Sequence, residues 1–213
     1  MRKVQLVSVF LFGVFVLMVL FQAGCSNSQE KKVLNKEELV QRGNYLVDFG
    51  GCNHCHSPKV MTETGPVTDT TRLLSGHPQD QPVMNVDPAI LNSKMWVHAS
   101  MDLTAWIGPW GVSYSANLTP DPETGLGNWT EDLFVKALRT GKHMGVGRPI
   151  LPPMPASDIG RMSDEDLKAI FTYLQSIPAI NNKVPDPVPP DMVASLMKKD
   201  DMKGNTGTVK KMQ

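Results

Sequence analysis

Two cysteines and a histidine stand together near the start of the chain, in the segment Gly51–His56. Cys52 and Cys55 are three residues apart, so one helical turn would place both thiols on the same side. His56 follows the second cysteine directly. The pattern C-x-x-C-H is typical of a c-type haem attachment site, in which two thiols bond to one porphyrin edge and the histidine ligates the iron. The motif therefore predicts one covalently attached haem c.

The same residues also fit two other kinds of site, a redox-active dithiol and half of a zinc site. A thioredoxin-like dithiol is expected within a βαβ pattern, and the sequence around Cys52 does not have that pattern. A zinc site needs a second pair of cysteine or histidine ligands, whereas the 213 residues contain one further cysteine, Cys25. Haem attachment is the favoured interpretation.

The second axial ligand of the iron decides between an electron carrier and an open catalytic site. Among 13 methionines, Met154 is the favoured ligand because it lies in a loop stiffened by Pro152, Pro153 and Pro155. Proline fixes φ and removes backbone donors, so such a loop can press a side chain onto a cofactor. The alternative is that Met154 fills an apolar gap, as methionine often does. The rival ligands are Met144, Met162 and His143, while His77 and His98 are expected to be structural.

Three helices are expected to position these residues. Each has an N-cap signal followed by apolar residues at helical spacing. The first begins after Asn35 and ends at Gly50–Gly51, the second begins after Thr130 and ends at Gly141, and the third begins after Ser163 and stops before Pro178. Residues 57–128 have no sustained period, and we expect an ordered excursion with a few short strands or turns. Its predicted apolar anchors are Met95–Val97 and Ala105–Ile107.

The N-terminus has the features of an export signal. Arg2 and Lys3 are followed by an apolar run from Val4 to Phe21, then by small residues before Cys25. The stretch ending in Cys25 resembles the lipobox of bacterial lipoproteins, in which that cysteine is lipidated. An uncleaved anchor helix is the alternative, because the run is close to the length that spans a bilayer. Both interpretations predict an exported chain held at a membrane.

Composition and these signals divide the chain into four predicted parts. They are a lipoprotein-type signal peptide at 1–24, a tether at 25–33, a haem domain at 34–180, and a Pro-rich and then charged, partly mobile tail at 181–213. Without the signal peptide the chain has 19 basic and 21 acidic residues, a net charge of −2. This balance argues against nucleic acid as a partner.

Several stretches together resemble class I cytochromes c. They are similar, more narrowly, to the cytochrome subunits of bacterial membrane-bound alcohol and gluconate dehydrogenases. The likeness covers roughly residues 40–178, and its motifs are Arg42–Val47, Cys52–His56, Ser113–Asp121, Gly125–Thr130 and Gly147–Pro155. The resemblance implies an all-α class I cytochrome c fold, with three main helices around one covalent haem. It also implies that His56 and Met154 ligate the iron. The first and last helices should cross, with Gly43 and Leu46 packed against Phe171 and Leu174.

By analogy with that fold, Trp129 and Arg148 are candidate contacts for the haem propionates, with packing and a surface charge as their alternatives. The related subunits often carry several C-x-x-C-H motifs, and this chain has one, which favours a single-step carrier. We therefore expect a non-enzymatic, periplasm-facing protein that carries single electrons between partner proteins. Those partners would be a dehydrogenase or quinol-oxidising complex and an oxidase or another cytochrome. The alternatives are a fixed subunit of a dehydrogenase complex, or a haem enzyme or gas sensor with an open iron site.

Overall fold

The computed structural model describes residues 33–81, 91 and 96–193. The chain divides into a first unit, residues 1–34, and a second unit from Asn35 onward, and the features below belong to the second. The predicted signal peptide, Cys25, nearly all of the predicted tether and residues 194–213 lie outside the described residues.

The three main helices begin where their capping residues predict. They are α2 (Lys36–Phe49), α4 (Glu131–Thr140) and α6 (Asp164–Leu174). Asn35 and Glu38 form a reciprocal capping box, in which each backbone N–H donates to the other's side chain at 3.0 Å. Thr130 and Ser163 each accept a hydrogen bond from the backbone N–H three residues on. Gly141 ends α4 with a φ of 63°, a conformation in which glycine is not strained.

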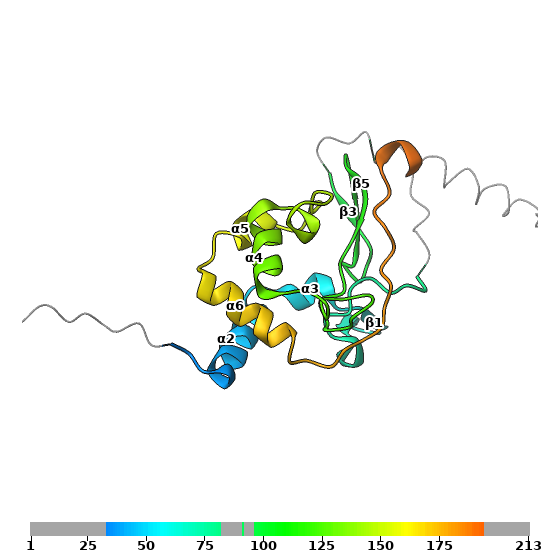
Figure 1. Ribbon diagram of the computed structural model, residues 1–213. Helices are drawn as coiled ribbons and strands as arrows, with labels where there is room; N and C mark the ends of the chain where they lie inside the picture. The colour runs from blue at the N-terminus through cyan, green and yellow to red at the C-terminus, as the bar shows by residue number, and fades with distance from the viewer. Residues whose placement is uncertain (1–32, 82–90, 92–95, 194–213) are drawn as a thin grey trace, which may run out of the picture. The chain divides into compact units, whose positions relative to one another are not determined.

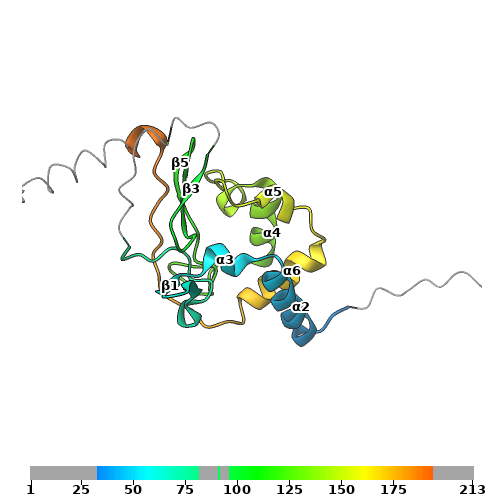
Figure 2. The same ribbon diagram turned by 180° about the vertical axis from the view of Figure 1, so that it is seen from behind.

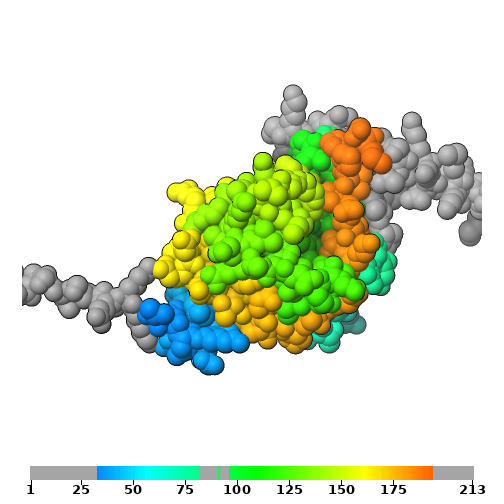
Figure 3. Space-filling model, in the orientation of Figure 1, coloured from blue at the N-terminus to red at the C-terminus, as the bar shows by residue number. Residues whose placement is uncertain are grey.

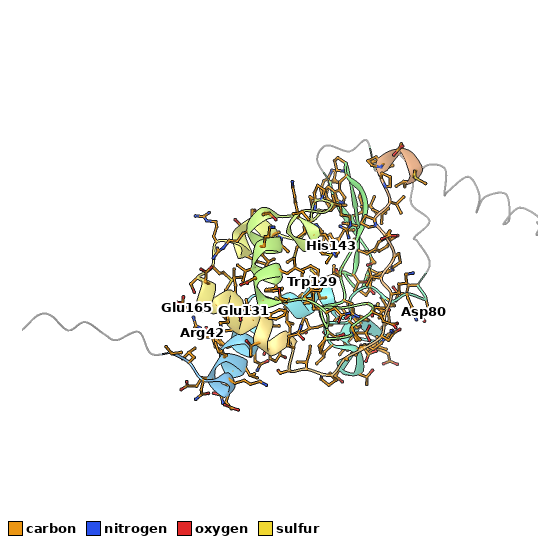
Figure 4. All side chains as sticks on the ribbon, in the orientation of Figure 1. Arg42, Asp80, Trp129, Glu131, His143 and Glu165 are labelled. Atoms are coloured by element: carbon orange, nitrogen blue, oxygen red, sulfur yellow. The ribbon has the colours of Figure 1, made fainter. Side chains whose placement is uncertain are left out.

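Helices α2 and α6 cross at Gly43, as the resemblance implied, but the nearest neighbours of Gly43 are Ala169 and Tyr173 and not the expected Phe171 and Leu174. A Cβ on Gly43 would lie 2.0 Å from the carbonyl oxygen of Ala169 and 2.6 Å from the Cβ of Tyr173, so the close approach requires glycine at this position. Beside this crossing, Arg42 pairs with Asp166 at 2.8 Å, and Figure 4 shows Arg42 next to the start of α6.

One apolar cluster joins the three helices. Its buried members are Val47, Leu74, Leu126, Phe134, Leu138, Leu167, Ile170, Phe171 and Leu174. Leu46, which was expected at the helix crossing, packs against this cluster. The rings of Phe134 and Phe171 are 5.3 Å apart, which connects α4 to α6. We call α2, α4, α6 and this cluster the helical side.

The excursion folds into two small antiparallel sheets, which corrects the expected all-α fold to a mixed one. The first is the hairpin of β1 (Lys59–Thr62) and β2 (Gly65–Thr68), and the 3-10 turn η1 (Thr70–Arg72) follows it. The second has the order β3 (His98–Ala99), β4 (Ala105–Gly108) and β5 (Gly111–Tyr114). The short strands themselves were expected in the excursion. Their positions could not be predicted, because strands of two to four residues are too short to give a readable period of two.

The predicted anchors of the excursion had different outcomes. Ala105 and Ile107 are buried, as expected, whereas Trp96 is 71% exposed and Val97 is also exposed. Met95 lies outside the described residues. Three consecutive apolar residues indicate that burial is favourable, but they do not indicate whether a distant segment packs over them. The predicted burial of Trp96 was wrong for this reason.

Part of the predicted tail packs on the second sheet. Val188 and Val112 exchange two backbone hydrogen bonds of 2.8 and 3.0 Å, and Val193 is buried against Ile107 and Val112. Figure 3 shows the orange segment that includes Val188 lying along the green residues of the excursion. The division at residue 180 stays a prediction. We call β1 and β2, residues 75–77, residues 98–118 and residues 180–193 the strand side.

The haem motif lies between these two sides. Figures 1 and 2 show the short helix α3 (Cys52–His56), with α2, α4 and α6 on one side of it and the strands on the other. The motif is therefore positioned by both.

Candidate haem site

The two thiols of α3 are suitably placed for one porphyrin edge. Cys52 and Cys55 are free cysteines on one helical turn, and Cys52 also packs against the apolar cluster of the helical side. Burial is the main cause that raises the pKa of each thiol above its ordinary value. Both thiols are therefore in the protonated form at neutral pH.

His56 is buried, and a single hydrogen bond sets the direction of its ring. Its Nδ1 lies 2.8 Å from the carbonyl oxygen of Ala116, so Nδ1 carries the proton and donates it. Nε2 is then the unprotonated nitrogen, and it has no hydrogen-bond partner among the described residues. Burial is the main cause that lowers the pKa of His56, which keeps the imidazole neutral and able to ligate a metal.

A short backbone ladder holds the carbonyl of Ala116 in place. The N–H of His77 donates to Ser115 at 2.9 Å, and the N–H of Gly76 donates to the carbonyl of His56 at 2.7 Å. Gly76 has a φ of 79°, and a Cβ there would lie 2.5 Å from the oxygen of Ser115. The sequence reasoning missed Ala116, because a residue that acts through its carbonyl has no side-chain signal.

Lys59 is a second residue that the sequence reasoning missed. Its Nζ donates to three backbone carbonyls, those of His54, of Ser57 at 3.1 Å and of Asp102 at 2.7 Å. The first two lie at the C-terminal end of α3, where backbone oxygens lack helical partners and a positive charge is favourable. Lys59 therefore joins the haem motif to the turn before β4.

The loop that contains Met154 meets the helical side. Met154 is half-buried and packs against the same apolar cluster as Cys52. The carbonyl of Pro152 accepts a 2.6 Å hydrogen bond from the hydroxyl of Ser113 on β5, and the carbonyl of Met154 accepts one of 2.9 Å from Ala156, the first residue of α5 (Ala156–Ile159). The thioether and the first thiol therefore adjoin one cluster, although they are about a hundred residues apart in the chain.

The rival ligands have different positions. Met162 is half-buried against the same cluster, so burial alone does not distinguish it from Met154. Met144, which is 45% exposed, and the exposed His143 lie in the 3-10 turn η3 (His143–Gly145) after α4. His98 is exposed on β3. His77 is buried, and its Nδ1 lies 2.8 Å from the hydroxyl of Thr104, which fits the expected structural role.

The two candidate propionate contacts differ in burial. Trp129 is half-buried at the edge of the helical cluster, and its ring meets the ring of His143 edge to face at 5.4 Å. Figure 4 shows Trp129 and His143 between α4 and the strands. Arg148 is exposed, and its guanidinium donates to the carbonyl of Pro149 at 3.3 Å. Their role toward propionates stays a prediction.

The residues present fit a covalently bound haem. Two free thiols stand one turn apart, the neighbouring imidazole has one nitrogen available for iron, and a half-buried methionine adjoins the same cluster. Among the described residues, no group of three or more His, Cys, Asp or Glu side chains is arranged to hold a metal ion by itself. Two thiols one turn apart and an adjacent imidazole are the donor set that covalent haem uses.

Comparison with known proteins gives several relatives, although no protein-family model matches the chain. The alcohol dehydrogenase (quinone) cytochrome c subunit of Gluconobacter oxydans (strain 621H) is 42% identical over 153 residues, which is 70% of this chain and 24% of that protein. The gluconate 2-dehydrogenase cytochrome c subunit of Pantoea cypripedii is 31% identical over 137 residues, 64% of this chain and 23% of that protein. The fructose dehydrogenase cytochrome subunit of Gluconobacter japonicus is 37% identical over 92 residues, 41% of this chain and 19% of that protein.

This chain is a homologue of dehydrogenase cytochrome c subunits. The resemblance to the cytochrome subunits of alcohol and gluconate dehydrogenases is thereby confirmed. This chain spans about a quarter of the length of the alcohol and gluconate dehydrogenase subunits that it matches. The activities of those whole proteins therefore do not transfer to it directly. In its described part, none of the helices combines the length and apolar character needed to cross a membrane.

Proposed function

We propose that this protein is a membrane-tethered monohaem cytochrome c that carries single electrons, with His56 and Met154 as the iron ligands. The hydrogen bond from Nδ1 of His56 to Ala116 carries the proposal, because it leaves Nε2 free beside two cysteines with thioether spacing. The relatives, which are cytochrome c subunits of dehydrogenases, support electron transfer as the task.

The residues of the chain would each have one part in this task. When bound, haem c supplies a one-electron couple between ferrous and ferric iron. Cys52 and Cys55 would hold the porphyrin edge as thioethers, and Ala116 would keep the ring of His56 in one orientation in both oxidation states. A thioether ligand from Met154 would raise the reduction potential and close the site to small ligands. Two ligands held in this way by the protein would minimise its rearrangement between the two oxidation states.

The partners and the membrane attachment are part of the same proposal. Cys25 would carry the lipid, and the haem domain would face the periplasm. The relatives are subunits of alcohol, gluconate and fructose dehydrogenases, so a dehydrogenase is the proposed electron donor. The same names favour a second arrangement, in which the protein is a fixed subunit of a dehydrogenase complex instead of a free carrier.

The ferric absorption spectrum of the haem-loaded protein tests the ligand pair. We expect low-spin iron with a methionine–iron charge-transfer band, which Met154→Ala should abolish while lowering the potential. Met162→Ala is the matched control, because Met162 is also half-buried against the apolar cluster, and it should keep the band. High-spin iron that binds carbon monoxide readily when reduced would contradict the proposal and favour an open-site enzyme or sensor.

Fractionation of cells tests the location and the partner. Cys25→Ser should release the protein from the membrane fraction, with its haem intact. A dehydrogenase that co-purifies with the wild-type protein at constant stoichiometry would establish the fixed-subunit arrangement, whereas a protein that purifies alone and still accepts electrons is a free carrier.

A further inference from the structure

One short run of residues on the strand side makes hydrogen bonds with both ligand-bearing segments. The hydroxyl of Ser113 donates to Pro152, two residues before Met154, at 2.6 Å. Three residues later, the carbonyl of Ala116 accepts from Nδ1 of His56 at 2.8 Å. Residues 113–116 therefore connect the loop of one proposed ligand to the ring of the other.

The Met154 loop has few other means of support. Pro152, Pro153 and Pro155 lack backbone N–H groups, so they cannot donate to any neighbouring segment. In the described part of the chain, the other hydrogen bonds of residues 151–155 are those that the carbonyls of Met154 and Pro155 accept from backbone N–H groups of α5. Among the described residues, the hydrogen bond from Ser113 is the one that ties this stretch to a distant element, and the side chain of Met154 adds apolar packing against the helical side.

Ser113 is itself held rigidly. It is 6% exposed, and it lies opposite Trp106 in the β4–β5 register. The preceding residue, Val112, is bonded to Val188, and the following segment is bonded through the N–H of Ser115 to Thr104 at 2.9 Å. The hydroxyl is therefore presented from a strand that is paired on both sides.

A second hydrogen bond sets the direction of the hydroxyl. Nε1 of Trp110 donates to Oγ of Ser113 at 3.2 Å, so one lone pair of Oγ is used and the hydroxyl proton is available for Pro152. The side chain of Ser113 is thus both acceptor and donor, which is the arrangement that fixes a hydroxyl rotor.

We propose that Ser113 is a positioning residue for the distal loop, which acts through the Pro152 carbonyl to keep the thioether of Met154 on the iron. This inference rests on the proposed His56/Met154 ligation. Because residues 113–116 also carry the Ala116 carbonyl, β5 and its extension would set the positions of the two proposed ligands relative to each other.

The test follows the methionine–iron charge-transfer band of the haem-loaded ferric protein as the pH is raised until the ligand is lost. Ser113→Ala removes one buried hydrogen bond, so detachment of Met154 from the iron should become about fivefold to tenfold more favourable. The pH at which half of the band is lost should fall by about 0.7 to 1 unit. Trp110→Phe keeps the hydroxyl but removes its orienting donor, and it should shift the midpoint by less in the same direction.

Ser176→Ala is the matched control. The hydroxyl of Ser176, just after α6, also donates to a backbone carbonyl, that of Tyr173 at 2.7 Å, but it is away from both ligand-bearing segments. Its midpoint should equal that of the wild type. If the wild-type protein lacks the band, both the ligation and this inference are wrong. If the wild type has the band and the midpoint of Ser113→Ala is unchanged, only the inference is wrong. If Ser113→Ala does not fold, the midpoint of Trp110→Phe tests the inference, and an unchanged midpoint would contradict it.

Discussion

The helical side and the strand side hold the haem motif by different interactions. On the helical side, side chains such as Leu167 and Leu174 are almost completely buried in one apolar cluster. On the strand side, the connections are mostly hydrogen bonds to backbone groups, for example those that Lys59, Ser113 and Asn182 donate. Apolar burial is nondirectional and supplies most of the free energy of folding, whereas hydrogen bonds are directional. The comparison suggests that the helical side supplies stability and the strand side supplies orientation.

Truncation of the helical core should have the largest effect on stability. Leu167→Ala at a fully buried position should lower the free energy of unfolding by about 2–5 kcal/mol, because transfer energy is lost and a cavity remains. Denaturant unfolding of the haem-loaded protein measures this, with Leu73→Ala as the control at a position that is 39% exposed. Equal losses of unfolding free energy in the two variants would contradict the assignment of stability to the helical side. The charge-transfer band of the folded Leu167→Ala protein should be unchanged.

The division between the two sides also explains how much of the molecule was predictable. The capping residues Asn35, Thr130 and Ser163 and the apolar spacing that follows them are local signals, and all three helices begin where those signals indicate. The C-x-x-C-H motif is local too, and its predicted haem is supported by the relatives.

The strand side could not be derived in this way, because its interactions join residues that are far apart in the sequence. Lys59 meets Asp102 from 43 residues away, and His56 meets Ala116 from 60 residues away. Three of the acceptors involved, Ala116, Pro152 and Asp102, act through their carbonyls, which every residue type possesses. Their side chains therefore gave no sign of the contact.

Loss of Asn182 should have the next largest effect and should change the haem site as well. Its Nδ2 donates to the carbonyls of Ser75 at 2.6 Å and His77 at 2.9 Å, on either side of Gly76, and its Oδ1 accepts from Gln79 at 2.9 Å. Asn182→Ala leaves these buried groups without partners, which should lower the free energy of unfolding by about 1–3 kcal/mol.

Because Gly76 bonds to the carbonyl of His56, the ferric spectrum of Asn182→Ala should shift, in contrast to that of Leu167→Ala. Asn181→Ala is the neighbouring control, since the Asn181 side chain donates to Asp121 at 3.4 Å, away from the ladder. A loss of stability without any spectral shift would show that the strand side supplies stability alone.

Lys59→Met should have a smaller effect on stability and a clear effect on potential. The substitution keeps most of the side-chain length but removes the donors that join α3 to Asp102, and each such bond contributes about 1 kcal/mol. It also removes a positive charge near Cys55, and this charge favours ferrous over ferric haem, so the reduction potential should fall. Redox titration measures the shift, and Lys59→Arg should restore most of it. An unchanged potential in Lys59→Met would mean that the charge is too far from the haem to matter.

The smallest expected effect is the pH dependence that comes from His77. Burial of the ring is the main cause that lowers the pKa of His77, and the charges of Asp102 and Asp80 act in the opposite direction. In the unfolded chain, histidine titrates near about 6.5 and so takes up protons more readily than the folded state does. The contribution of His77 to stability is therefore complete above this pH and is lost as the pH falls below it, by at most about 1.4 kcal/mol per pH unit.

Comparison of two variants isolates this contribution from that of the other titrating groups. The free energy of unfolding of the haem-loaded protein is measured at pH 8 and pH 5.5 for His77→Gln and for the exposed His98→Gln. His77→Gln is destabilised at both values but should lose less between them than the wild type, because its side chain no longer takes up a proton on unfolding. His98→Gln should keep the wild-type difference. If His77→Gln also keeps the wild-type difference, the ring of His77 is as easily protonated in the folded protein as in the unfolded chain. The hydrogen bonds that join His77, Thr104 and Asp102 would then tolerate a positive charge, which a network of fixed donors and acceptors should exclude.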